Sequence, residues 1–116
     1  MVKIYTSPGS QSSRKAINWF KENNIPYNEK NIVSTPLDDS DILEIFKRSE
    51  NGTEDFISTR SKVINETKVD IDSMSLNELM HFIKDNPTVL KRPIMIDDRR
   101  FQVGYNAEEI RSFIPR

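Results

Sequence analysis

Residues 1–32 read MVKIYTSPGSQSSRKAINWFKENNIPYNEKNI and predict a strand, a turn, a helix and a second strand. The first strand covers 2–6, which is β-branched and aromatic, and it stops at the turn residues Ser7-Pro8-Gly9. Apolar residues then recur at helical spacing as far as Asn23-Asn24. The second strand is expected over 25–32, so this part of the chain forms a βαβ unit.

The middle of the chain predicts helices. One helix is expected to open at Thr35-Pro36 and to end at Asn51-Gly52, because glycine commonly closes a helix. Residues 53–85 continue helical in short pieces, the last of them capped by Ser75 and ended by Asn86-Pro87.

The last quarter predicts a hairpin and a closing helix. Segments 94–96 and 101–103 read as strands joined by a turn at Asp97-Asp98-Arg99-Arg100, and Asn106 caps the last helix. This order is the plan of a thioredoxin-like α/β fold with a mixed four-stranded sheet, although order alone leaves other α/β plans open. We expect one domain over 1–116, its core about 1–34 and 90–116, with a helical subdomain inserted at about 35–89.

Composition narrows the function classes. The chain has 116 residues, 30% of them charged, and a net charge of −1, so bulk charge favours neither nucleic acid nor an acidic membrane as a direct partner. It shows no signal peptide and no apolar run of about 20 residues, which predicts a cytoplasmic protein without a membrane partner. The absence of cysteine excludes disulfides, cysteine zinc sites and iron–sulfur clusters, and we expect no metal and no cofactor.

Segment 7–13 lies where α/β sheets bind ligands, at a helix N-terminus that favours an anion or a thiolate. Ser10 and Ser13 stand there at C-x-x-C spacing, but a serine needs a neighbouring base to act as a nucleophile. The single histidine, His81, belongs to a helix elsewhere, and no Ser/His/Asp arrangement is visible. We therefore expect no catalytic residue and interpret the serines as helix caps, with a residual anion site or a removed redox switch as alternatives.

Three separated blocks carry a resemblance to a known family. They are TSPGSQSSRKA near the start, ENGTEDFISTRSK in the middle and KRPIMIDDRRFQVGYNAEEIRSFIPR at the end. In combination and spacing they resemble the Spx transcription regulators, which belong to the arsenate-reductase-like (ArsC) branch of thioredoxin-like folds. The resemblance runs along the whole chain without obvious insertions.

The resemblance implies a transcriptional regulator rather than an enzyme. Spx-type proteins bind the C-terminal domain of the RNA polymerase α subunit, block some activators and direct polymerase to stress-response promoters, meeting promoter DNA only within that complex. The contact glycine of the family falls on Gly52, and Lys47, Glu50 and Asn51 lead to it. Two interpretations of Lys62 stay open: a residue near promoter DNA, or part of an ordinary solvated face.

The resemblance also identifies what is missing. Ser10 and Ser13 match the C-x-x-C redox switch of the family, so the switch is absent. Arg60 and Arg92 match arginines that cradle the oxyanion in arsenate reductases, and Pro93 matches a cis-proline. From this we expect an anion near Ser10–Ser13 and Arg92.

Two alternatives stay open beside the regulator. The first is a cysteine-less decoy, which titrates polymerase or a protease adaptor without activating transcription. The second is an arsenate-reductase-like enzyme, which would lack its thiolate nucleophile.

Overall fold

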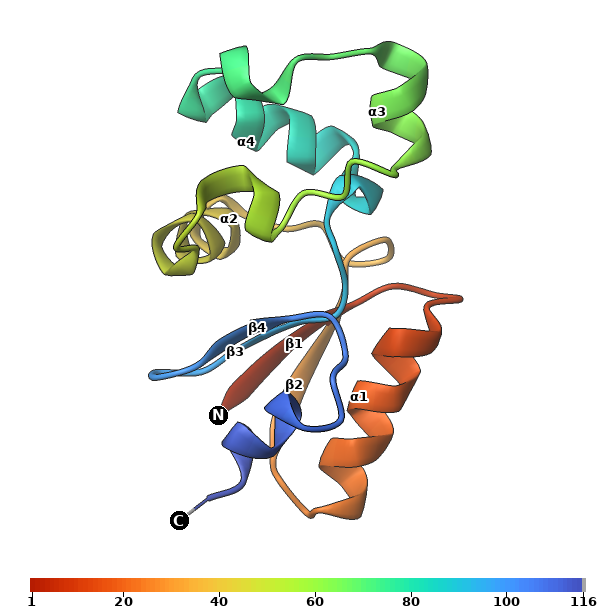
Figure 1. The fold of residues 1–116 in the computed structure, drawn as a ribbon, viewed down its shortest axis with the longest axis vertical. Coiled ribbons are helices and arrows are strands. Elements are labelled where there is room, and N and C mark those ends of the chain that lie inside the picture. Colours follow the sequence, from red (N-terminus) through yellow and green to blue (C-terminus); the bar gives the residue numbers. More distant parts are fainter. Residues whose placement is uncertain (116) are drawn as a thin grey trace. The chain divides into compact units, whose positions relative to one another are not determined.

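The computed structural model describes residues 1–115, and the chain divides into two compact units (Figure 1). Unit 1 comprises residues 1–31 together with the segment from Arg92 onward, and unit 2 comprises Ile32–Lys91. No helix among the described residues is long and apolar enough to cross a membrane.

Unit 1 contains the sheet. Its four strands are β1 (Val2–Thr6), β2 (Tyr27–Asn31), β3 (Ile94–Ile96) and β4 (Phe101–Val103), in the order β2-β1-β3-β4. β1 runs parallel to β2 and antiparallel to β3, which is in turn antiparallel to β4. The predicted mixed four-stranded sheet is therefore confirmed, although β2 is shorter than the expected 25–32.

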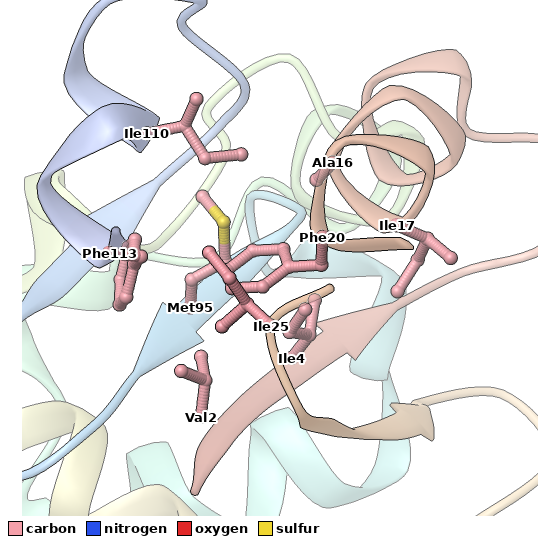
Figure 2. Close-up of a cluster of buried hydrophobic side chains, with 9 residues drawn as sticks. All are labelled: Val2, Ile4, Ala16, Ile17, Phe20, Ile25, Met95, Ile110 and Phe113. Atoms are coloured by element: carbon pink, nitrogen blue, oxygen red, sulfur yellow. The ribbon is translucent and has the colours of Figure 1, made fainter. Parts of the chain in front are cut away.

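One face of the sheet packs on helix α1 (Gln11–Glu22), which ends as predicted at Asn23, its C-cap. Phe20 is fully buried, and its ring lies 5.5 Å from that of Phe113 and 5.8 Å from that of Tyr27. Burying a phenylalanine contributes roughly 2–3 kcal/mol to folding. The core cluster in Figure 2 joins side chains from α1, two strands, the connection between α1 and β2, and the C-terminal segment: Val2, Ile4, Ala16, Ile17, Phe20, Ile25, Met95, Ile110 and Phe113.

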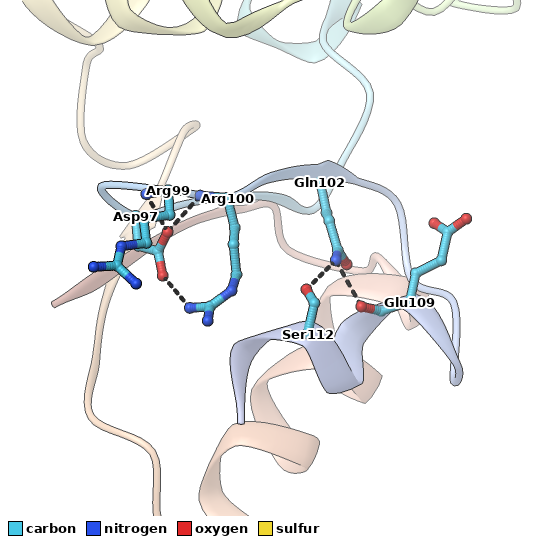
Figure 3. A network of polar contacts seen from close by, with 6 residues as sticks. All are labelled: Asp97, Arg99, Arg100, Gln102, Glu109 and Ser112. Carbon is cyan, nitrogen blue, oxygen red and sulfur yellow. Dashed lines mark hydrogen bonds and ion pairs between the residues drawn. The ribbon is translucent and has the colours of Figure 1, made fainter. Parts of the chain in front are cut away.

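Asp97 organises the predicted hairpin turn between β3 and β4 (Figure 3). Its carboxylate accepts hydrogen bonds from the backbone N–H groups of Arg99 (2.9 Å) and Arg100 (2.6 Å), and from Arg100 Nη1 (3.0 Å). Burial alone would raise the pKa of Asp97, but these hydrogen bonds outweigh burial and lower it. The turn is thus held by a charged acceptor.

The closing helix is shorter than predicted. It is a 3-10 helix, η4 (Glu109–Phe113), and the Asn106 side chain caps the turn before it by accepting from the N–H groups of Glu108 and Glu109. Gln102 Nε2 of β4 donates 2.6 Å hydrogen bonds to the Glu109 carbonyl and to Ser112 Oγ (Figure 3). Ile114 is the C-cap, and Pro115 after it disfavours helical backbone at Ile114.

Unit 2 is helical in short pieces, as predicted. Its elements are α2 (Asp39–Arg48), η1 (Gly52–Asp55), α3 (Lys62–Thr67), η2 (Ile71–Ser73), α4 (Leu76–Asp85) and η3 (Pro87–Val89). Ser75 caps α4 as expected, within a capping box that Glu78 completes.

The predicted bounds of α2 were wrong at both ends. The helix does not open at Thr35-Pro36 but after Asp38, because Asp38 and Asp41 form a capping box. It does not end at Asn51-Gly52 but at Arg48, with Ser49 as the C-cap.

The residues that follow η1 pair with the extended segment at the end of unit 2. Ile57 bridges antiparallel to Leu90, and 2.8 Å backbone hydrogen bonds flank that bridge, from Ser58 N–H to the Val89 carbonyl and from Lys91 N–H to the Phe56 carbonyl. Phe56 is 1% exposed, and its ring stacks on that of Phe46 at 5.1 Å. The residues just after η1 are therefore rigidly placed within unit 2.

Candidate functional site

The Ser7–Ser13 turn leads from β1 into α1, where sequence reasoning placed the serine pair. Ser10 is the N-cap of α1, and its Oγ accepts a 3.1 Å hydrogen bond from Ser13 N–H. The capping interpretation is confirmed for Ser10. It does not hold for Ser13, which belongs to the first turn of the helix.

Two hydroxyl groups in this turn are buried without partners. Ser13 is 3% exposed and Ser7 is 8% exposed, and neither Oγ has a hydrogen-bond partner. A buried polar group without a partner destabilises a fold by about 1–3 kcal/mol. The turn therefore carries polar atoms that nothing among residues 1–115 satisfies.

A hollow of about 400 Å³ lies beside the Ser7–Ser13 turn within unit 1, and Arg14 and Lys21 of α1 contribute to its lining. The Thr6 hydroxyl donates a 2.8 Å hydrogen bond to Glu29 Oε2 on the same side. The lining thus offers both cations and a carboxylate, and an anion at this place stays a prediction.

Arg92 lies at the same end of the sheet as the Ser7–Ser13 turn. Because Tyr5 pairs with Ile94, the residues just before β3 stand where β1 passes into the turn. The Arg92-Pro93 peptide bond is cis, as the resemblance implied. Arg60, the other arginine of the predicted pair, belongs to unit 2 and is exposed.

The second candidate surface is the Gly52 loop, residues 49–55, together with Lys47 in the last turn of α2. The Asp55 carboxylate accepts the hydrogen bonds that order this loop. Its Oδ2 accepts 2.9 Å hydrogen bonds from the N–H groups of Glu50 and Asn51, and its Oδ1 accepts one from Asn51 Nδ2 at 3.3 Å. The Asn51 backbone hydrogen bond is the main cause that lowers the pKa of Asp55, so the loop is tied by a charged group.

Gly52 stands open within that loop. Its φ is +76°, and a Cβ built on it would meet no atom within 4 Å. The prediction that Gly52 closes a helix was wrong, because α2 ends at Arg48 with Ser49 as its C-cap and Gly52 begins η1. Internal packing does not exclude a side chain there, whereas the backbone conformation favours glycine.

The remaining predicted residues lie on the surface of unit 2. Lys47, Glu50 and Asn51 are all exposed, so they share one accessible segment with Gly52. Lys62 opens α3 and forms an exposed ion pair with Glu66 at 3.7 Å. Such a pair contributes little to stability, and it leaves the Lys62 charge available for a partner.

Sequence reasoning missed Asp55, which holds the loop. The available signal was a carboxylate a few residues beyond an Asn-Gly pair, because Asp side chains commonly accept from nearby backbone N–H groups. Among residues 1–115, no three His, Cys, Asp or Glu side chains gather where they could hold a metal ion.

The chain is similar in sequence to a known family and to proteins of known name. The pattern that defines the ArsC family matches residues 5–113. Two relatives match the whole chain over 88% of their own length: "Global transcriptional regulator Spx 1" from Bacillus cereus, at 53% identity, and "Global transcriptional regulator Spx" from Listeria innocua, at 52%.

Solved structures support the fold. An arsenate reductase from Vibrio cholerae superposes with a TM-score of 0.84 at 16% identity, covering 97% of this chain and 96% of its own. A putative ArsC-family-related protein from Bacteroides fragilis gives 0.81 at 24% identity, with the same coverage. At these identities the likeness concerns the fold alone.

Proposed function

Because this chain belongs to the ArsC family and is more than half identical to proteins named Spx along its whole length, we propose that it is a transcriptional regulator of the Spx type. In this proposal it docks on the C-terminal domain of the RNA polymerase α subunit. It blocks some activators there and directs polymerase to stress-response promoters.

The observation that carries the proposal is the Gly52 loop. Asp55 fixes its backbone, and Gly52 leaves open space where any other residue would project a side chain. A partner can therefore approach the backbone closely without first ordering the loop, which lowers the entropic cost of binding.

The proposed docking surface consists of Lys47, Glu50, Asn51 and Gly52, which are all exposed. It offers both charges and an amide around a small central residue, as the polar rim of an interface does. A typical interface covers about 800 Å² on each partner, so a protein of this size can block an activator that uses the same α surface.

Regulation in this proposal does not use a thiol switch, because the chain has no cysteine and Ser10 and Ser13 occupy the switch positions. Lys62 would lie near promoter DNA only within the polymerase complex. Arg92 and Arg60 would either bind an anion or stabilise the conformation that is active in regulation. A protease adaptor is a further proposed partner.

The test uses Gly52→Arg with a matched control. Both Gly52 (φ +76°) and Gly104 (φ +83°) have positive φ and open space for a Cβ, so arginine at either position meets similar backbone strain, about 1–2 kcal/mol. Gly104 lies in unit 1, away from the proposed surface in sequence. Binding to the purified α C-terminal domain is measured by calorimetry.

We expect the parent and Gly104→Arg to bind alike, and Gly52→Arg to lose binding by at least about a hundredfold because the new side chain obstructs the partner. Circular dichroism should show both variants folded. Equal affinity of Gly52→Arg and Gly104→Arg would remove the proposed surface, and no binding by the parent would remove the proposed partner.

The decoy alternative rests on the missing thiols. Run-off transcription from a thiol-stress promoter separates the two: a regulator raises the transcript with or without reductant, whereas a decoy lowers or leaves it. A reductase would need a cysteine nucleophile, so turnover of arsenate with glutaredoxin by the pure protein would contradict both readings.

A further inference from the structure

A hollow of about 500 Å³ adjoins the Gly52 loop within unit 2. It continues the proposed docking surface, because residues of the loop form part of its wall. The side chains that matter below come from the loop, η1, the bridge segment, α3 and η2: Asn51, Glu54, Ile57, Ile64, Ile71 and Asp72.

The less exposed part of the lining includes the isoleucines Ile57, Ile64 and Ile71, here called the aliphatic floor. Ile57 is 3% exposed and belongs to the buried core, whereas Ile64 and Ile71 remain half-buried. Half-buried isoleucines around an open space of this volume gain apolar contact when another aliphatic chain enters, at about 25 cal/mol for each Å² covered.

The exposed part of the lining, here called the rim, carries the carboxylates of Glu54 and Asp72 beside the neutral Asn51 and Thr59. Within the described residues, the carboxylates of Glu54 and Asp72 have no hydrogen-bond or ion-pair partner, and no lysine or arginine lines the hollow. The cations that adjoin the lining in sequence, Arg60 and Lys68, do not line the hollow, and Lys91 Nζ donates to the Glu54 backbone carbonyl at 2.7 Å. An incoming cation would therefore meet unneutralised negative charge.

From this pairing of aliphatic floor and acidic rim, we infer that the hollow binds a lysine or arginine side chain of a protein partner. The methylene stem lies on Ile64 and Ile71, and the cationic head meets Glu54 and Asp72. Long basic side chains combine these two needs, since the stem is apolar and the end is charged. The identity of the partner, the polymerase α C-terminal domain, rests on the proposed function.

A titration tests the hollow without that partner. The full chain with labelled isoleucine methyl groups is titrated with Nα-acetyl-lysine methylamide and with its uncharged counterpart, Nα-acetyl-norleucine methylamide. We expect saturable shifts of the Ile64 and Ile71 signals with the lysine compound, and about fivefold weaker binding of the norleucine compound. Equal responses, or none, would overturn the inference.

A second measurement connects the hollow to the partner. Glu54→Gln/Asp72→Asn should bind the α C-terminal domain about fivefold to tenfold more weakly than the parent, and its affinity should depend less on salt. The control is Glu22→Gln/Asp98→Asn, which removes two exposed carboxylates from unit 1 and should bind like the parent.

The outcomes separate the two proposals. If the parent binds α and the hollow variant binds equally well, the hollow is not part of the interface and the inference fails, while the proposed function stands. If the parent does not bind α, the proposed function fails, and the lysine titration alone decides what the hollow takes.

Discussion

The two turns that carry the candidate sites share a glycine and differ in everything around it. Gly9 in the Ser7–Ser13 turn and Gly52 in its loop have φ values of +77° and +76°. A Cβ built on either glycine would meet no atom within 4 Å. Around Gly9, two buried serine hydroxyls lack partners. Around Gly52, one carboxylate accepts three hydrogen bonds.

In the proposed function, this difference separates a former site for thiol chemistry from a site for recognition. The Ser7–Ser13 turn keeps the position and the helix N-terminus that a reactive thiolate would need, but it holds serines that nothing activates. The Gly52 loop contains no reactive group, and its order comes from hydrogen bonds within the loop. Removing single polar groups from each turn tests this contrast.

Among the changes that remove a single group from either turn, Asp55→Ala should give the largest effect, because it leaves the Gly52 loop without its shared acceptor. Hydrogen bonds to a charged group stabilise more than neutral ones, so the loop should lose its order. We expect binding to the α C-terminal domain to weaken about tenfold or more, measured by calorimetry. Asp98→Ala, which removes an exposed hairpin carboxylate, is the control and should bind like the parent. Unchanged affinity of Asp55→Ala would show that the loop needs no such tie.

Removing single hydroxyls from the Ser7–Ser13 turn should give smaller effects of opposite sign. Ser10→Ala removes an N-cap and should lower the free energy of unfolding by about 1 kcal/mol. Ser13→Ala removes a buried hydroxyl without a partner and should raise it by about 1 kcal/mol.

Urea denaturation measures both changes, and Ser12→Ala, a half-buried serine in the same helix, should stay within about 0.5 kcal/mol of the parent. If Ser13→Ala destabilises the protein as Ser10→Ala does, the Ser13 hydroxyl has a role that its surroundings do not show.

Acidification should give the smallest effect. The pKa of Asp55 is lowered in the folded protein, so its stabilising contribution is complete above the ordinary value of 3.8 and is lost as pH falls through the lower folded value. Affinity should therefore change less than about twofold between pH 7 and pH 5, on the basis of this titration. The Asn51 amide signal in NMR should titrate with a midpoint below 3.8, and a midpoint above 3.8 would contradict the tie between Asp55 and the loop.

The sheet of unit 1 could be predicted because its signals are local. Residues 2–6 form a β-branched and aromatic run that is followed by a turn and then by a helical pattern of apolar residues. Near the other end of the chain, the Asp97–Arg100 turn separates two short strands. The order of the elements favours a thioredoxin-like plan but leaves other α/β plans open, and the resemblance to the ArsC branch implies that plan. The strands and the turn themselves need no knowledge of distant contacts, whereas the pairing of β1 with β3 does.

The Gly52 loop could not be predicted in the same way. The Asn51-Gly52 pair looks like a helix end, yet α2 stops at Arg48 because the backbone N–H groups that follow turn to Asp55. At the other end, the Asp38–Asp41 capping box decided the start, although Thr35-Pro36 offered an earlier one. In both places a carboxylate competed for backbone hydrogen bonds, and periodicity does not report that competition.

The two outer strands of the sheet bear on how this protein avoids unwanted self-association. β2, at one edge, presents the polar run Tyr27–Asn31, with Pro26 directly before it, and β4, at the other edge, is only three residues long. Charged side chains, a nearby proline and short length all discourage a neighbouring molecule from adding a strand. In the proposed function, such edges favour binding to the partner over strand addition by a second copy of the chain.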